Sequence, residues 1–439
     1  MPGPPGFFPR TRITIFYGAI MGTPKPHRNS SKPLIPRMSE EHLYGLLHSS
    51  YSFKDASFIS RNLFRPFWKV MDNACSNNAA PMCLLGFSMA LNVFNVLLLS
   101  WWDPEFNPMT VPRGVFALCL LGHVMAFTCV GIDAAGRLHR RTEADTDNAE
   151  NPVLSPYSSA EYVDRACESL NLCMKAVCLL HIVGVGGSNL SYFTGFLIVA
   201  VILGCYLSQQ WEACLTGIFQ TSFFIDSIEL FLLAGFLGKV FYGADLTWAA
   251  LRTTTLLDAP LSQLLGCCFF VGAFISTGKT FCRTGQIMAS NSHQSPLLPF
   301  LALQVSAFSW TLSPSVPTAF PYLCWSTAIV SSGLVTQLIL NQISQNDGVH
   351  PGSFVHVPVL ALLAVWNFLG MFSGLVAVRN AWITVCVLLT FWQVVTAVHA
   401  AKDVLRRLLL AVIESFFRRT ACALAPYWNM LKKDSRTRL

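Results

Sequence analysis

The feature that most constrains this chain is a series of apolar stretches, each about 20 residues long, along most of its 439 residues. A helix of about 20 residues crosses the hydrocarbon core of a bilayer. Only 12% of the residues are charged, about half of the roughly 25% found in ordinary soluble domains. The sequence therefore predicts an all-α polytopic membrane protein whose surroundings are the lipid bilayer.

Ten segments are predicted as transmembrane helices from their length and apolar content. They are Pro81–Trp101, Gly114–Ile132, Leu172–Val185, Tyr192–Ser208, Ile218–Tyr242, Leu261–Ser276, Leu298–Leu312, Ala319–Ile343, Val357–Val376 and Ala381–Ala400.

The flanking regions differ from this apolar domain, which we place at residues 80–400. Residues 1–37 are rich in Pro and basic residues and are predicted to be a disordered leader. Residues 38–79 form an interfacial pre-membrane segment that ends in the string Arg65-Pro66-Phe67-Trp68-Lys69. Residues 401–439 form a basic tail, in which 404–419 has the pattern of an amphipathic helix on the membrane surface or against a partner.

The distribution of charge predicts orientation rather than nucleic-acid binding. The formal net charge is +7, and the basic residues gather in short loops and in the tail, as they do on the cytosolic side of membrane proteins. We therefore expect a cytosolic N-terminus, motif loop and C-terminal tail. The fifteen cysteines have neither CxxC pairing nor zinc-like spacing, so a disulfide framework is not expected.

A charged island, Gly131–Leu170, interrupts this apolar pattern. Asp164 and Glu168 are spaced i, i+4 and so lie on one face of a helix that runs into the third span. Asp133 ends the second span at a comparable depth. Converging carboxylates suit Mg²⁺ or Mn²⁺, and nearby basic side chains suit phosphate: Arg137, Arg140 and Arg141. The alternative is that these are ordinary solvated charges beside the spans.

The island resembles the signature of the CDP-alcohol phosphatidyltransferase family, in the form found in eukaryotic choline and ethanolamine phosphotransferases. The matching strings are GRLHRRT from Gly136, Ser155-Pro156, and EYVDRACES from Glu161. Further similar strings, such as Trp211-Glu212 followed by Thr216-Gly217, extend the resemblance over roughly residues 39–410.

The resemblance implies transfer of phosphoethanolamine or phosphocholine from CDP-ethanolamine or CDP-choline to diacylglycerol, with release of CMP. It implies Mg²⁺ or Mn²⁺ bound by Asp133, Asp164 and Glu168, with Glu168 also acting as the base. Gly136, Arg140 and Arg141 would contact phosphate. It also implies an endoplasmic reticulum or Golgi membrane, and either a homodimer or a heterodimer.

Departures from the signature keep other functions open. Ala135 stands at the first aspartate of the signature, and Glu168 replaces the last one. A catalytically impaired paralogue that binds lipid, nucleotide or a partner subunit is one alternative. A transporter is another, because Asp226 and Glu229 lie i, i+3 in an apolar run. These two carboxylates either face the same cavity as Asp164, as a polar wall or a substitute ligand, or one of them pairs with Lys175 or Lys239. We interpret His181 as a core histidine.

Overall fold

The computed structural model describes helices, strands and connections between residues 52 and 343. The described ranges are 52–54, 57–74, 81–107, 110–147, 157–186, 190–216, 218–220, 222–243, 253–256, 259–288, 297–312 and 316–343, with residues 251, 384 and 388. The predicted leader, the predicted basic tail and the last two predicted spans lie outside these residues.

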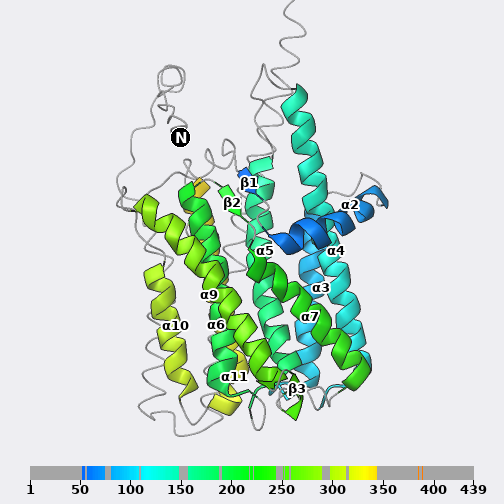
Figure 1. The fold of residues 1–439 in the computed structure, drawn as a ribbon, viewed down its shortest axis with the longest axis vertical. Coiled ribbons are helices and arrows are strands. Elements are labelled where there is room, and N and C mark those ends of the chain that lie inside the picture. The colour runs from blue at the N-terminus through cyan, green and yellow to red at the C-terminus, as the bar shows by residue number, and fades with distance from the viewer. Residues whose placement is uncertain are drawn as a thin grey trace, which may run out of the picture. The chain divides into compact units, whose positions relative to one another are not determined.

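Most of the described chain is helical (Figure 1). In chain order the elements are β1 (Ser52–Lys54), the π-helix Ser60–Phe64, α2 (Arg65–Ala74), α3 (Pro81–Trp102), α4 (Arg113–Asp147), α5 (Tyr157–Val183), α6 (Tyr192–Thr216), β2 (Ile218–Gln220), α7 (Phe223–Tyr242), β3 (Thr255–Leu256), β4 (Ala259–Pro260), α9 (Leu261–Met288), α10 (Leu297–Thr311) and α11 (Val316–Ile343).

A helix stands at each of the first eight predicted spans. Within the described ranges, five helices are long and apolar enough to cross a membrane: Leu84–Trp102, Arg113–Ile132, Arg165–Val183, Tyr192–Thr216 and Leu261–Gly285. The protein is therefore a largely helical chain with several candidate spans, and the full count of ten stays a prediction.

Three helices differ in extent from the predicted spans, although the second candidate span itself ends at Ile132 as predicted. α4 continues beyond Ile132 to Asp147, where we expected a loop to begin, because the charged residues there do not interrupt the helix. α5 starts at Tyr157, as expected of a helix that carries Asp164 and Glu168, but its candidate span begins at Arg165 rather than at the predicted Leu172. The fifth segment begins as the short strand β2, and α7 starts only after Ser222, whose hydroxyl accepts a hydrogen bond from the Phe224 backbone N–H as an N-cap.

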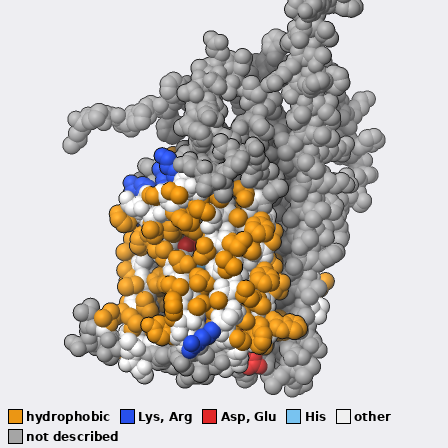
Figure 2. Space-filling model, turned by 90° about the vertical axis from the view of Figure 1, so that its right-hand side faces the viewer, with side chains coloured by type: hydrophobic (Ala, Val, Ile, Leu, Met, Phe, Trp, Pro, Cys, Tyr) orange, Lys and Arg blue, Asp and Glu red, His pale blue; other side chains and the backbone are white. Residues whose placement is uncertain are grey.

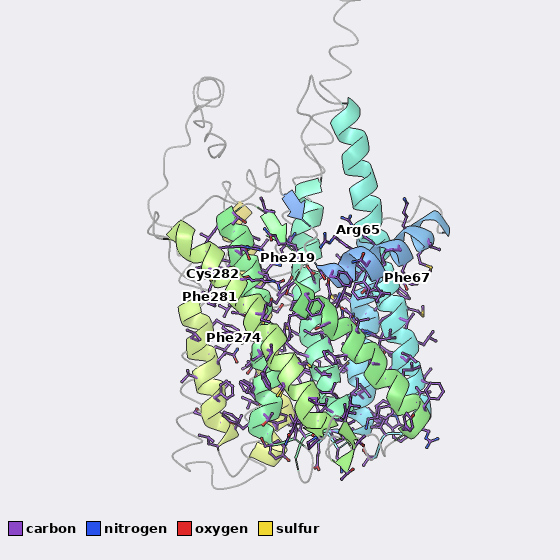
Figure 3. All side chains as sticks on the ribbon, viewed as in Figure 1. Arg65, Phe67, Phe219, Phe274, Phe281 and Cys282 are labelled. Carbon is purple, nitrogen blue, oxygen red and sulfur yellow. The ribbon has the colours of Figure 1, made fainter. Side chains whose placement is uncertain are left out.

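The helices pack around one apolar core. α5 lies among α3, α7, α6 and α11, while α6 also packs on α9 and α10. Several large side chains are fully buried in this core, among them Leu180, Phe196, Phe236 and Phe320. Figure 3 shows the side chains of these helices meeting in the middle of the bundle.

The outside of the bundle is also apolar. Phe274 on α9 is 78% exposed and Val305 on α10 is 68% exposed, and Phe274 is labelled in Figure 3. Figure 2 shows hydrophobic side chains over most of the described face, with Lys and Arg near its upper and lower edges. A surface of this kind matches lipid better than water, because an ordinary soluble protein does not expose so large an apolar area.

Two short strands pair at the end of the bundle where α5 begins. β1 and β2 run parallel with Phe53 opposite Phe219, and the pair lies at the top of Figure 1, where α4 also ends. We call this the strand end of the bundle. The pairing joins the segment before α2 to the connection between α6 and α7.

Candidate functional site

The residues predicted to carry the chemistry lie on α4 and α5, near the strand end (Figure 1). Asp133, Gly136, Arg140 and Arg141 are all within α4, and Asp164 and Glu168 are one turn apart on α5. Of their side chains, only that of Glu168 is among the described residues. The prediction that the helix bearing Asp164 and Glu168 runs into the third span is confirmed, since α5 is continuous to Val183.

Glu168 is half-buried and is held by a side chain from another helix. The hydroxyl of Tyr206 on α6 donates a hydrogen bond to Glu168 Oε2 at 3.1 Å and lies 3.5 Å from the carbonyl oxygen of Arg165. Tyr206 is 2% exposed. A buried phenol donating to a carboxylate fixes its position and stabilises its charge. The sequence reasoning missed Tyr206, whose only signal was one hydroxyl within an apolar run.

Arg165, between the two predicted ligands, is also buried. Its guanidinium lies over the Phe219 ring, with Cζ 3.9 Å from the ring centroid. Phe219 belongs to β2, which pairs with β1, and Figure 3 labels Phe219 near that strand pair. A cation over an aromatic face is attracted to the ring quadrupole, so β2 contacts the same turn of α5 that carries Asp164 and Glu168.

α2 lies across α4 just below its charged part. Phe64, Phe67 and Trp68 surround Phe127, with ring centroids 4.7, 6.1 and 5.5 Å from it. Trp68 also packs on Gly131, where a Cβ would collide with the indole. The aromatic string predicted for the interface therefore packs partly on α4, although Phe67 itself stays 40% exposed, and Figure 3 labels it on α2.

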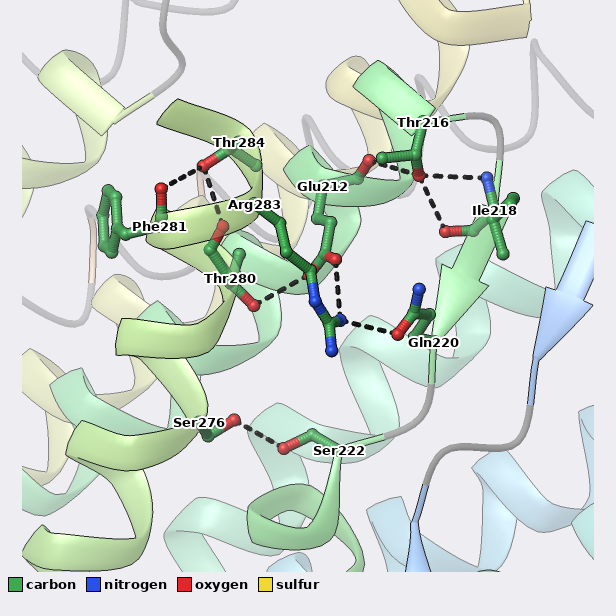
Figure 4. Close-up of polar contacts among 10 residues, drawn as sticks. All are labelled: Glu212, Thr216, Ile218, Gln220, Ser222, Ser276, Thr280, Phe281, Arg283 and Thr284. Carbon is green, nitrogen blue, oxygen red and sulfur yellow. Dashed lines mark hydrogen bonds and ion pairs between the residues drawn. The ribbon is translucent and has the colours of Figure 1, made fainter. Parts of the chain in front are cut away.

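The Trp211-Glu212 string also has a structural role at the strand end (Figure 4). Glu212 is 4% exposed, and its carboxylate accepts hydrogen bonds from the Thr280 hydroxyl at 2.9 Å and from Arg283 Nη1 at 3.0 Å. Arg283 also donates to Gln220 Oε1 at 2.6 Å. Glu212 therefore links α6 to α9, and Arg283 links α9 to β2.

Of the two carboxylates on α7, Glu229 has partners on two other helices. Glu229 forms an ion pair with Lys175 of α5, and its Oε2 lies 3.4 Å from His123 Nε2 of α4. Of the two alternatives left open for these carboxylates, the structure shows the lysine pair for Glu229 and Lys175. Lys239 is fully buried with its Nζ 5.6 Å from the Phe116 ring centroid.

His181 is the core histidine that the sequence predicts. It is 1% exposed, its Nδ1 is 3.2 Å from Asp103 Oδ2, and its Nε2 is 3.4 Å from the Ser100 hydroxyl. The Phe106 ring covers it, with centroids 4.3 Å apart. These contacts tie the end of α5 to the connection between α3 and α4.

Within the described part of the chain, no three His, Cys, Asp or Glu side chains gather closely enough to hold a metal ion. The side chains of Asp133 and Asp164 lie outside that part. The predicted ligand set, and the predicted phosphate contacts of Gly136, Arg140 and Arg141, therefore stay predictions.

Known proteins with similar sequences are phosphotransferases. The chain is 25% identical to Ethanolaminephosphotransferase 1 of Homo sapiens over 323 residues, which is 70% of this chain and 77% of the human protein. It is 28% identical to Ethanolaminephosphotransferase 1 of Mus musculus, over 41% of this chain and 44% of that protein. It is 26% identical to Cholinephosphotransferase 1 of Saccharomyces cerevisiae, over 45% of this chain and 46% of the yeast protein.

No family model matches the chain. The resemblance to ethanolamine and choline phosphotransferases is nevertheless confirmed, because it holds over 70% of the chain in the human comparison.

Proposed function

We propose that this chain is an integral membrane phosphotransferase of the CDP-alcohol type. It would transfer phosphoethanolamine or phosphocholine from the CDP-alcohol to diacylglycerol in the endoplasmic reticulum or Golgi membrane. The observation that carries the proposal is Glu168, a half-buried carboxylate held by Tyr206 at the strand end of the bundle, on a chain similar to ethanolamine and choline phosphotransferases.

The proposed reaction is a displacement at phosphorus. The diacylglycerol hydroxyl oxygen forms a bond to the phosphorus of the phospho-alcohol group, and the bond from that phosphorus to CMP breaks. Glu168 takes the hydroxyl proton, and CMP leaves with the bonding electrons. Tyr206 would keep the Glu168 carboxylate in place for this transfer. Arg140, Arg141 and the backbone at Gly136 would contact the phosphates from α4.

The carboxylates at this end of the bundle are suitable ligands for a hard cation. Asp164 and Glu168 stand one turn apart on α5, and Asp133 supplies a third carboxylate from α4. We propose these three groups as ligands for Mg²⁺ or Mn²⁺, which would neutralise the charge of the pyrophosphate.

The orientation follows from the basic residues near the strand end. Arg283 at the end of α9, together with the arginines of α4, would place this end on the cytosolic side. The nucleotide substrate would then reach the site from the cytosol and diacylglycerol from the membrane.

A direct test is transfer activity in membranes that lack it. The full chain is supplied with labelled CDP-ethanolamine or CDP-choline, diacylglycerol, and Mg²⁺ or Mn²⁺. We expect lipid product that disappears in Asp164→Ala and Glu168→Gln and persists in the control Glu143→Gln, an acidic residue of α4 outside the proposed ligand set. Absence of product with either donor and either metal, from folded protein, would refute the proposal.

Ala135 favours a second candidate, a catalytically impaired paralogue that binds lipid, nucleotide or a partner subunit. An alanine cannot replace the aspartate that the signature carries at this place. If Ala135 is what limits catalysis, Ala135→Asp should raise the transfer rate above that of the unmodified chain. A chain that is inactive in both forms but still binds CDP-ethanolamine would support the paralogue.

A further inference from the structure

Gln210 is a fully buried glutamine on α6 near the strand end of the bundle. Its exposed fraction is 0%. Within the described part of the chain, neither its Oε1 nor its Nε2 has a hydrogen-bond partner. A buried amide without partners destabilises a fold, because it loses its hydrogen bonds to water and gains none in return. Of the two residues before it, Gln209 is also buried with its Nε2 without a partner, whereas the hydroxyl of Ser208 donates to a backbone carbonyl oxygen at 2.6 Å.

Gln210 lies one helical turn from Tyr206, the residue that holds Glu168. Residues i and i+4 share a face of a helix, and the next position on this face, Cys214, contacts the Leu338 carbonyl oxygen of α11 at 3.7 Å. Gln210 therefore lies on the face of α6 that meets α5 at Tyr206 and α11 at Cys214. Tyr206, one turn earlier on this face, reaches the turn of α5 that carries Glu168.

The direction of α6 indicates which substrate this amide faces. α6 runs from Tyr192 toward β2, so Gln210 is about 6 Å nearer the strand end than Tyr206, at 1.5 Å per residue. In the proposed reaction the diacylglycerol hydroxyl reaches Glu168 from the membrane, and the CDP-alcohol enters from the strand end. Gln210 is on the CDP-alcohol side of Glu168.

We propose that Gln210 is a specificity-determining residue whose Oε1 accepts a hydrogen bond from the primary ammonium of phosphoethanolamine. This inference rests on the proposed function. A primary ammonium has three N–H donors, whereas the quaternary ammonium of choline has none. The amide therefore favours CDP-ethanolamine over CDP-choline, and the substrate supplies the hydrogen bond that the buried side chain lacks.

The test compares Gln210→Leu with a matched control, Gln304→Leu. Gln304 on α10 is 5% exposed, and both atoms of its amide also lack partners among the described residues. Both substitutions remove a buried amide from the core, so both are expected to raise the melting temperature. Only Gln210→Leu is expected to change substrate preference.

The full-length protein in lipid nanodiscs is assayed for the KM and kcat of both donors and for equilibrium binding of CDP-ethanolamine. We expect Gln210→Leu to raise the KM and the Kd for CDP-ethanolamine by about 10- to 100-fold, the range for a hydrogen bond to a charged group. The KM for CDP-choline and for diacylglycerol, and every constant of Gln304→Leu, should change less than about threefold.

The possible failures are distinguishable. If the unmodified chain turns over or binds CDP-ethanolamine and Gln210→Leu leaves that constant unchanged, the role of Gln210 is refuted and the proposed function stands. An equal rise for both donors, or a rise only for diacylglycerol, also refutes it. If the unmodified chain neither binds nor converts either donor, both proposals fail together.

Discussion

The buried ion pair between Lys175 and Glu229 gives a quantitative test of how the bundle is held together. The side chains are 12% and 17% exposed, and they join α5 to α7 near the middle of the bundle. Removing one partner of a buried pair leaves an uncompensated charge and costs about 3–5 kcal/mol. We therefore expect Lys175→Met to lower the free energy of unfolding by about that amount.

A variant of the other partner and the double variant complete a double-mutant cycle. Glu229→Leu leaves the ammonium of Lys175 buried and should cost a similar amount. The double variant Lys175→Met with Glu229→Leu should lie within about 1–2 kcal/mol of the unmodified protein, because apolar replacements often compensate for a lost buried pair. The measurement is denaturant unfolding in detergent micelles, followed by tryptophan fluorescence.

The control for this cycle is Lys279→Met on α9, where the lysine is exposed. It should change the free energy of unfolding by no more than about 0.5 kcal/mol. If the two single costs simply add in the double variant, to within about 0.5 kcal/mol, then Lys175 and Glu229 do not stabilise each other and the reasoning is wrong.

Substitutions at three further positions test other contacts by the same unfolding measurement. Thr280→Val removes one donor to the buried Glu212 carboxylate and should cost about 1.5–3 kcal/mol, as for hydrogen bonds to charged groups; an unchanged stability would mean that Arg283 alone satisfies Glu212. Ser222→Ala removes the N-cap of α7 and should cost about 1 kcal/mol, whereas Ser222→Gly should cost less. Gly131→Val would collide with the Trp68 indole, so we expect the free energy of unfolding to fall by about 1–3 kcal/mol. We also expect faster tryptic cleavage within α2. Unaltered cleavage would refute the contact between Trp68 and Gly131.

The helices were predictable where one physical signal dominated. Apolar length placed a helix at each of the eight predicted spans that fall within the described residues. The i, i+4 spacing placed Asp164 and Glu168 on one helix. The cost of a buried charge suggested a lysine partner as one of two alternatives for a carboxylate in an apolar run, and Lys175 is that partner. These signals are local, so a single sequence contains them.

The remaining contacts depend on residues far apart in the chain. The pairing of Phe53 with Phe219 joins segments more than 160 positions apart, and three-residue strands carry too little periodicity to be recognised. Tyr206 reaches Glu168 from another helix, which no spacing rule indicates. The extension of α4 to Asp147 was missed because apolar periodicity stops at Ile132, although Arg, Ala and Glu are good helix formers.

Because α4 is one continuous helix, the position of a residue in its sequence determines the side of the helix on which that residue lies. On a straight helix each residue turns the chain by about 100°, so Asp133, Gly136 and Arg140 fall on one stripe and Ala135 faces a different direction. Insertion or deletion of one residue near Gly131 would turn the whole charged end of α4 by about 100°, so this stretch should tolerate substitutions far better than changes in length.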